Sequence, residues 1–353
     1  MKQQLSRRDF LKIGGLGVIG LGGTAVLTQT GHRKAGRTML PVQNMGDIAM
    51  QGMMEAAGMQ GMPGPVGEVD HQANGFDPSQ VLTDFDYGEV STLPNGQTLR
   101  EYNVVAMDQD VELMPGIVFK AWVYNGRIPG PTLRCVEGDR LRIHFTNASE
   151  MAHSMHFHGF HPSEMDGVPG AGPGLIQPGG QFTYEFDAHP FGLHLYHCHA
   201  FPLARHIAKG LYGAFIIDPK GGRPAVDHEF VMVMSGFDVD FDDANDFYAV
   251  NTIPFHYQLN PIPIRVGEKV RVYLVNITEF DLINSLHLHV NFFDYYPTGT
   301  SLTPAEFTDT IMQAQAQRGI LEFTYRYPGE YMFHAHQSEF AELGWMGLFQ
   351  VSA

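Results

Sequence analysis

The stretch HLYHCHAFPLARH, residues 194–206, places a cysteine directly between two histidines. Successive side chains of a β-strand point to opposite faces, so His197 and His199 would share one face while the thiol of Cys198 would leave from the other. Thiolate and imidazole groups are ligands for copper and zinc ions. This strand is therefore predicted to contribute to two different metal sites.

A second histidine-rich stretch, HSMHFH, begins at His153 and follows the same alternation. In a strand, His156 and His158 would share one face, and His153 would lie on the opposite face with Cys198. His206 follows the cysteine by eight residues, in a loop that could fold back to complete a set of two imidazoles and one thiolate. This is the ligand set of a blue copper site. Zinc is the alternative, although zinc sites usually close with a fourth protein ligand.

The weak axial position of such a copper site would be occupied by Leu211, five residues beyond His206. A leucine side chain has no electron pair to donate to the ion. Oxidised copper would therefore be less stabilised than it is by methionine, and the reduction potential should be higher.

The second half of the chain repeats the first. VEGDRLRIHFTN (136–147) corresponds to RVGEKVRVYLVN (265–276), and GLYGAFII (210–217) corresponds to GWMGLFQV (344–351). Two HxH pairs lie between these segments in each half. Four paired features in one order indicate two homologous domains. The four HxH pairs are His156/His158, His197/His199, His287/His289 and His334/His336.

From about residue 97 onward, short alternating segments are separated by Gly and Pro turns, a pattern typical of β-sandwiches. We therefore expect an all-β fold of two domains, residues 97–218 and 227–353, joined by the Gly/Pro linker DPKGGRPAV. Residues 31–96 are rich in Gly, Pro and Met and are expected to be flexible. The methionine run in this segment could collect Cu(I), or the segment could be a disordered leader that tolerates methionine.

Residues 1–30 contain the sequence SRRDFLK followed by an apolar stretch from Ile13 to Leu27. Two consecutive arginines before such a stretch predict a twin-arginine export signal, and hence a periplasmic or otherwise exported protein. The stretch is shorter than the roughly 20 residues that a membrane span needs. A retained anchor is the alternative, because no A-x-A cleavage site follows.

The formal net charge of −16 disfavours nucleic acid as a partner, because affinity for nucleic acid comes from basic contacts to phosphate. Two cysteines cannot form a disulfide framework, and if Cys198 binds a metal then Cys135 has no partner. Eighteen histidines against two cysteines favour metal chemistry instead.

These residues and spacings resemble those of the multicopper oxidases, specifically the bacterial two-domain kind with type 1 copper in the first domain. The resemblance covers about residues 97–353 and implies two cupredoxin-like Greek-key β-sandwiches with a trinuclear copper cluster at a domain interface. It also implies four copper ions per functional unit: one type 1, one type 2 and two type 3. The implied ligands are His153, Cys198 and His206 for type 1; His158 and His287 for type 2; His156, His197 and His336 for one type 3 ion; and His199, His289 and His334 for the other.

The resemblance further implies a laccase-like reaction. One-electron oxidation of a donor, either a phenolic or aromatic compound or a metal ion such as Cu(I), would be coupled to four-electron reduction of dioxygen to water. Electrons would leave the type 1 site through the sulfur of Cys198. Asp166 would match the acid that helps to move protons, or it would be only a turn residue before glycine. A homotrimer with clusters at subunit interfaces is also implied, although the sequence alone allows pairing within one chain.

Two other functions are compatible with parts of the sequence. A copper-containing nitrite reductase is the alternative enzyme, and the long loop between Cys198 and His206 resembles that family as well as the two-domain oxidases. In nitrite reductases, however, the residue after the blue-site cysteine is not histidine and an aspartate stands near the position of His156, so His199 and His156 favour a multinuclear cluster. The third hypothesis is a non-enzymatic exported copper-binding protein, against which the presence of all eleven ligands argues.

Overall fold

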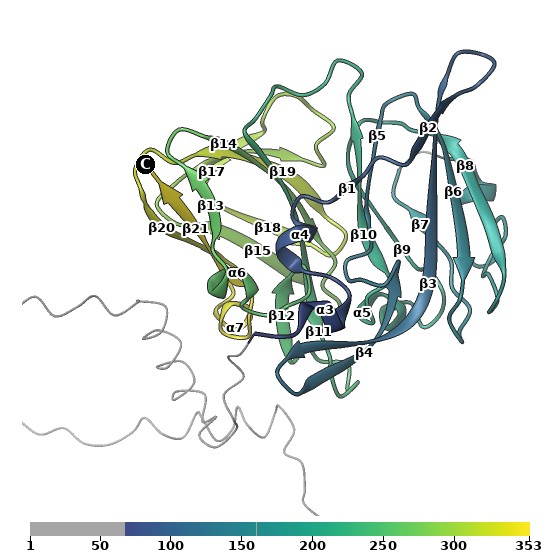
Figure 1. The fold of residues 1–353 in the computed structure, drawn as a ribbon, viewed down its shortest axis with the longest axis horizontal. Helices are drawn as coiled ribbons and strands as arrows, with labels where there is room; N and C mark the ends of the chain where they lie inside the picture. Colours follow the sequence, from purple (N-terminus) through teal and green to yellow (C-terminus); the bar gives the residue numbers. More distant parts are fainter. Residues whose placement is uncertain (1–67, 160) are drawn as a thin grey trace, which may run out of the picture. The chain divides into compact units, whose positions relative to one another are not determined.

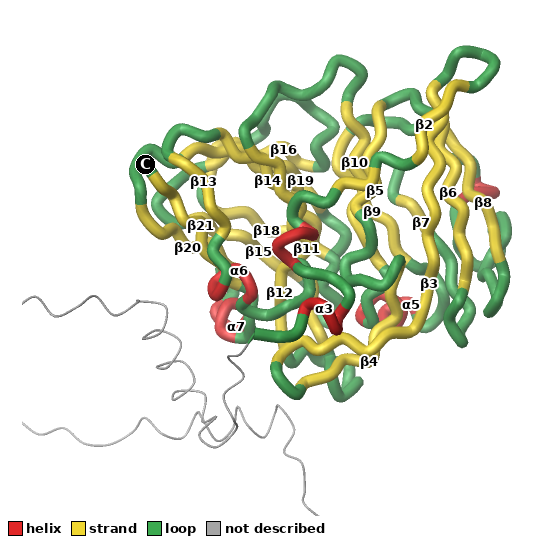
Figure 2. The backbone as a smooth tube through the Cα atoms, in the orientation of Figure 1, coloured by secondary structure: helices red, strands yellow, loops and turns green. Residues whose placement is uncertain are grey.

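A computed structural model of the chain describes residues 68–159 and 161–353, in which β-strands predominate (Figure 1). Figure 2 shows that the helices in this part are short single segments between strands and loops. No helix among the described residues is long and apolar enough to cross a membrane. The predicted export signal and the methionine run lie outside the described residues.

The first sandwich consists of two five-stranded sheets. Its strands are β1 (Phe85–Asp86), β2 (Glu89–Thr92), β3 (Thr98–Met114), β4 (Ile117–Tyr124), β5 (Thr132–Val136), β6 (Arg140–Asn147), β7 (His156–Phe157), β8 (Gln181–Asp187), β9 (Gly192–His197) and β10 (Tyr212–Asp218). One sheet has the order β2-β3-β6-β8, with β4 also paired to β3, and the other has the order β1-β5-β10-β9-β7. In β6, Leu141, Ile143 and Phe145 are buried in the core between the sheets, and the residues between them are partly exposed. This is the alternation expected of a strand with one face in the core.

The second sandwich consists of a six-stranded and a five-stranded sheet. Its strands are β11 (His228–Phe237), β12 (Phe247–Val250), β13 (Ile262–Arg265), β14 (Lys269–Asn276), β15 (Ile283–Leu288), β16 (Phe293–Pro297), β17 (Glu306–Thr308), β18 (Thr310–Ala314), β19 (Arg318–Thr324), β20 (Gly329–His334) and β21 (Met346–Ser352). The sheet orders are β12-β11-β14-β19-β16-β17 and β13-β21-β20-β15-β18. A separate buried cluster of apolar side chains forms the core between these sheets.

The strand pairing of the two sandwiches repeats as the sequence predicts. Strand β6 is parallel to β3 and antiparallel to β8, while β14 is parallel to β11 and antiparallel to β19. Strands β6 and β14 each follow a tight turn that contains a glycine at positive φ, 92° at Gly138 and 88° at Gly267. Residues with a Cβ atom rarely adopt this conformation. The predicted all-β fold of two similar sandwiches is confirmed.

A third apolar core joins the two sandwiches. Leu193, Leu195 and Ile216 of the first sandwich belong to the same buried cluster as Val231 and Val233 of the second. Strands β9, β10, β11 and β14 are therefore buried on both faces, which explains the apolar runs AFII in β10 and FVMVM in β11.

Residues 68–96 differ from the prediction of a flexible segment. They form α3 (His71–Asn74), α4 (Pro78–Val81), β1 and β2, and β1 pairs in parallel with β5. The carboxylates of Asp70 and Asp77 cap the two helices, and Val81 is buried in the core between the sandwiches. These elements have only two to four residues each, which is too short for a periodic pattern to reveal.

Candidate metal centre

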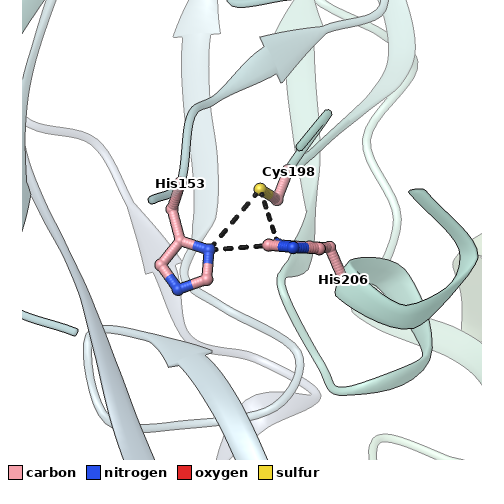
Figure 3. Close-up of side chains that lie close together, drawn as sticks. All are labelled: His153, Cys198 and His206. Atoms are coloured by element: carbon pink, nitrogen blue, oxygen red, sulfur yellow. Dashed lines mark hydrogen bonds between the residues drawn. The ribbon is translucent and has the colours of Figure 1, made fainter. Parts of the chain in front are cut away.

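His153, Cys198 and His206 meet in the interior of the first sandwich (Figure 3). Sγ of Cys198 lies 3.7 Å from Nδ1 of His153 and 3.4 Å from Nδ1 of His206, and the two nitrogens are 3.1 Å apart. Three ligands placed trigonally at about 2.0–2.3 Å from one ion would be about 3.5–4 Å from one another. The three donor atoms therefore fit one metal ion with only small movements.

Three different elements position these side chains. His153 pairs with Ile176 in an isolated bridge, Cys198 follows the last residue of β9, and His206 lies in helix α5 (Leu203–Ala208). The loop predicted after the cysteine thus contains a short helix, which returns the second imidazole to the thiol. All three residues are at most 2% exposed, so solvent is excluded from the site.

Burial also determines the protonation of these groups. Desolvation lowers the pKa of His153 to about 4, with a further contribution from His206, and lowers the pKa of His206 to about 4. Both imidazoles are therefore neutral at pH 7, with nitrogen electron pairs available to a metal. Desolvation raises the pKa of Cys198 to about 11, so a metal ion must displace the thiol proton to bind.

Trp122 and Ser149 also contact this site, and sequence patterns did not identify them. The ring centroid of Trp122 lies 4.6 Å from that of His206 and 5.1 Å from that of His153. Oγ of Ser149 is 3.0 Å from Nε2 of His153, the ring nitrogen that does not face the thiol. A hydrogen bond at this position fixes the orientation of a ligating imidazole. Neither residue stands in a recognisable motif.

Leu211, the predicted axial residue, is fully buried in the same apolar core as Cys198. Its carbonyl oxygen accepts a hydrogen bond from the backbone nitrogen of Cys198 at 3.0 Å. This bond places the two residues side by side. The leucine side chain offers no donor atom to an ion.

A first histidine set lies on the other face of the cysteine-bearing strand. His156 pairs with His197 across strands β7 and β9, and Nε2 of His158 lies 3.1 Å from Nε2 of His197. The ring centroid of His199 lies 5.1 Å from that of His156. His156, His158, His197 and His199 thus lie together, as the alternation along the two strands predicts.

A second histidine set has the same arrangement in the second sandwich. His287 pairs with His334 across β15 and β20, and Nε2 of His289 lies 2.9 Å from Nε2 of His334. The ring centroid of His336 lies 5.4 Å from that of His287. Four predicted residues are therefore together here as well. Two nitrogens about 3 Å apart are spaced as neighbouring ligands of one ion at about 2.0–2.1 Å would be.

Hydrogen bonds around the two sets repeat atom by atom. The Nδ1 atoms of His156 and His287 lie 2.9 and 3.1 Å from the carbonyl oxygens of Asp166 and Asp309. Nδ1 of His197 lies 2.9 Å from the carbonyl oxygen of Cys198. The corresponding contact in the second sandwich joins His334 to Ala335, so alanine stands where the first sandwich has its cysteine. Among the described residues, the second sandwich therefore has no thiol at the place where the first sandwich has Cys198.

The two histidine sets do not meet within the described chain. No hydrogen bond or ring contact between described residues joins a histidine of one set to a histidine of the other. The candidate metal groups within these two sets, His156, His158 and His197 in the first and His287, His289 and His334 in the second, each stay within one sandwich. An open hollow of about 630 Å³ lies over His156 and His158. The second sandwich lines it with Thr298, Thr300 and Arg318, and not with its histidines. A trinuclear site within one chain therefore has no geometric support.

Comparison with known proteins gives the family of the chain. Residues 107–222 and residues 229–353 each match a family model described as multicopper oxidase. The chain belongs to the multicopper oxidase family. A solved structure described as a multicopper oxidase is 61% identical to the chain, with a TM-score of 0.80, and the match covers 81% of this chain and 100% of the other. The predicted membership of a two-domain multicopper oxidase family is confirmed.

Copper-containing nitrite reductases are also similar to this multicopper oxidase. The nitrite reductase of Neisseria meningitidis serogroup A is 30% identical over 254 residues, which are 65% of this chain and 63% of the relative. The chain thus spans less than two thirds of the length of this curated relative. A solved copper nitrite reductase from Nitrosomonas europaea is 26% identical with a TM-score of 0.66, covering 72% of this chain and 94% of the other.

Asp166, the predicted acid of this multicopper oxidase, contacts the first histidine set. Its Oδ1 lies 3.1 Å from Nδ1 of His156 and 3.7 Å from Nε2 of His161, and its side chain is 31% exposed. Asp309 holds the corresponding place in the second set, where Thr310 donates a hydrogen bond to its carboxylate and lies 2.8 Å from Nδ1 of His287. Each set thus has a carboxylate close to a ligand candidate, and the sequence predicted only the first.

Proposed function

We propose that this multicopper oxidase oxidises a one-electron donor and reduces dioxygen to two molecules of water, with four electrons and four protons consumed for each dioxygen. The main support for this proposal is the position of Cys198. Its thiol faces His153 and His206, while its neighbours His197 and His199 belong to the first histidine set. Copper bound at these residues would supply the one-electron redox chemistry. The covalent backbone, about 3.8 Å per residue, connects the two sites.

The paired nitrogens support a revised division of the ligands. His158 and His197 would share one type 3 ion, because their Nε2 atoms lie 3.1 Å apart. His289 and His334, at 2.9 Å, would share the other. His156 and His287 would bind the type 2 ion. His336 and His199 would each add a third ligand to one of the two type 3 ions.

This division exchanges the predicted roles of His156 and His158. The equivalence of His156 and His287, whose Nδ1 atoms both lie against an aspartate carbonyl, supports the exchange. The type 1 ion would be held by His153, Cys198 and His206, and Leu211 would offer it no donor atom. One functional unit would then hold four copper ions.

We further propose that the trinuclear clusters form between subunits of a homotrimer. Each sandwich holds four histidines in the same arrangement, and within one chain the first set faces Thr298, Thr300 and Arg318. The missing half of each cluster must then come from the second sandwich of another copy. Three copies joined head to tail would complete three clusters in a closed ring.

The chain's own residues would position dioxygen and supply protons. The buried imidazoles have lowered pKa values, about 4 for His197 and about 3 for His158, chiefly because of desolvation. They are therefore neutral and serve as ligands, not as proton donors, at pH 7. Asp166, which is partly exposed and contacts His156, would transfer protons from solvent toward the oxygen-reducing site.

The donor would be a phenolic or aromatic compound or a metal ion such as Cu(I). The twin-arginine sequence SRRDFLK supports export, so the reaction would take place in the periplasm or elsewhere outside the cytoplasm.

Copper nitrite reductase is the second candidate, because relatives with that name are similar to the chain. A mononuclear second site needs only three imidazoles. This chain has four in each sandwich, and His199 lies against His156 and His197. The additional imidazoles favour the trinuclear site.

The test is to load the full chain with Cu(II), measure copper per chain and the visible spectrum, and follow oxygen uptake with a phenol and with Cu(I). Four copper ions per chain, an intense blue thiolate-to-copper band and oxygen consumption are expected. Two copper ions per chain with nitrite reduction and no oxygen uptake would overturn the proposal in favour of a nitrite reductase.

A further inference from the structure

A third group of metal-ligating side chains lies apart from the copper candidates. It consists of His71 in α3, Asp77 at the N-cap of α4, and His256, the first residue of α6 (His256–Leu259). One ligand atom from each residue lies within 4.8 Å of the others. His71 and Asp77 precede the first sandwich, whereas His256 belongs to the second. These residues therefore connect distant parts of the chain.

The geometry around His256 is close to that of a metal site. Its Nε2 atom lies 2.8 Å from Oγ of Ser79 and 3.8 Å from Oδ1 of Asp77. The ring centroids of His71 and His256 are 5.1 Å apart, in an edge-to-face arrangement. Tetrahedral ligands at about 2.0–2.1 Å from one ion are about 3.3 Å apart. Closing the group around an ion would thus require the ligand atoms, which lie within 4.8 Å of one another, to approach by at most about 1.5 Å.

One polar atom in this group has no partner among the described residues. Nδ1 of His71 is shielded from solvent and makes no hydrogen bond. A buried ring nitrogen that is left unsatisfied is costly, so such an atom in a native protein calls for an explanation. A bound cation explains it, because the cation would take this nitrogen as a ligand.

The protonation of the group suits a cation. His256 is 4% exposed, and its pKa is lowered to about 4 by desolvation and then by the neighbouring His71. Its imidazole is therefore neutral at pH 7. Two imidazoles and one carboxylate form the donor set found in three-ligand zinc sites, and they also suit Cu(II).

A small cavity beside the group leaves room for one further ligand. It has a volume of about 20 Å³ and is lined by both histidines, by Glu68 and by Met114. A cavity of this size holds about one water molecule. A water in this space could complete a four-coordinate ion.

We propose that His71, Asp77 and His256 bind one divalent first-row transition-metal ion, outside the copper sites of the oxidase, and that this ion fastens helices α3 and α4 to the second sandwich. Because a ligand that binds only the folded protein stabilises it, the ion would raise the unfolding temperature. The proposal is independent of the oxygen chemistry.

The experiment first removes copper beyond four ions per chain from the copper-loaded full chain by dialysis against a weak chelator. It then titrates Zn²⁺ by calorimetry and compares His71→Gln and Asp77→Asn with the wild type. His71 is only partly buried, and asparagine keeps the N-cap of α4, so both variants should fold. His144→Gln is the control, since this partly exposed histidine contacts Thr183 and Glu101 in the first sandwich.

The wild type and the control should bind one Zn²⁺ per chain, and Zn²⁺ should raise their unfolding temperature. Each site variant should bind at least about tenfold more weakly, as expected when one of three ligands is lost, while keeping wild-type oxygen uptake. Binding that is equal in the wild type and both variants, or no binding in any of them, would overturn the proposal and leave a hydrogen-bonded contact without an ion.

Discussion

Sγ of Cys198 lies 3.4 Å from Nδ1 of His206, which helix α5 returns to the end of strand β9. The two residues are at most 2% exposed, and the ring centroid of Trp122 lies 4.6 Å from that of His206. The fold thus brings these donor atoms together from the end of a strand and from a helix. Such preorganisation favours a geometry set by the protein and not by the metal.

Replacement of Cys198 by alanine should abolish the blue absorption and oxygen uptake, because the thiolate is both a ligand and the link to His197 and His199. The far-ultraviolet circular dichroism should remain that of a folded β protein. Cys135→Ala is the matched control, since Cys135 is also buried but lies outside the site. A Cys198→Ala variant that stays blue would rule out this mononuclear site.

Leu211→Met should lower the reduction potential of the type 1 site, because a thioether at the axial position stabilises oxidised copper. Leucine and methionine have similar volumes, so the fold should lose less than about 1.5 kcal/mol of stability. A redox titration followed at the blue band measures the effect. Leu195→Met, in the core between the sandwiches, should leave the potential unchanged. Equal potentials in all three proteins would exclude Leu211 from the axial position.

Asp166→Asn should slow oxygen reduction by about 10²–10³-fold, as expected for loss of a positioned proton donor. Under anaerobic conditions the variant should still bleach its blue band at the wild-type rate when donor is added, since Asp166 contacts His156 and not the type 1 site. Stopped-flow spectroscopy separates the two half-reactions. A wild-type rate of oxygen uptake in the Asp166→Asn variant would show that Asp166 is only a turn residue and not a proton donor.

Glu229 should make the free energy of unfolding depend on pH. Desolvation alone would raise its pKa, but hydrogen bonds from Arg134, Tyr273 and Arg271 outweigh this and hold the pKa at about 2. Because the folded-state pKa is below the unfolded value of 4.5, the stabilisation is complete above about pH 5. It is lost as the pH falls toward 2.

Chemical denaturation of the wild type and Glu229→Gln at a series of pH values tests this expectation. The wild type should lose more stability than the variant between pH 5 and 2.5, by roughly 2 kcal/mol. Asp110→Asn, at an exposed ion pair with Lys120, should follow the wild-type curve. Parallel curves for the wild type and Glu229→Gln would contradict the assignment.

Alternation along strands predicted much of the site. It placed His153 and Cys198 on one face and the HxH pairs on the other, because side-chain direction in a strand depends only on sequence spacing. It does not determine how His156 and His158 are divided between ions, since the division proposed above rests on the 3.1 Å contact between the Nε2 atoms of His158 and His197. Contacts between distant segments were also missed, including Trp122 beside His206, because no local pattern records them.

The segment of residues 68–96 was also not predicted correctly from its sequence. Its composition suggested flexibility, yet β1 pairs with β5 and Phe76 is buried between the sandwiches. Gly and Pro mark turns equally well in a flexible segment and in a short ordered one. Only the contacts that the segment makes with distant parts of the chain distinguish a flexible segment from a short ordered one.

Co-expression of two complementary variants tests the intersubunit cluster most directly. His158→Ala damages the first histidine set and His334→Ala damages the second, so each variant alone should be inactive. Two affinity tags would isolate trimers that contain both chains. In a head-to-tail ring, every such trimer has one interface with both halves intact.

The purified mixed trimers should therefore consume oxygen at about one third of the wild-type rate. Mixed trimers of His158→Ala with His199→Ala, both damaged in the first set, should be inactive and serve as the control. If the His158→Ala and His334→Ala mixture is as inactive as its parents, the cluster is not shared between subunits and the account is wrong.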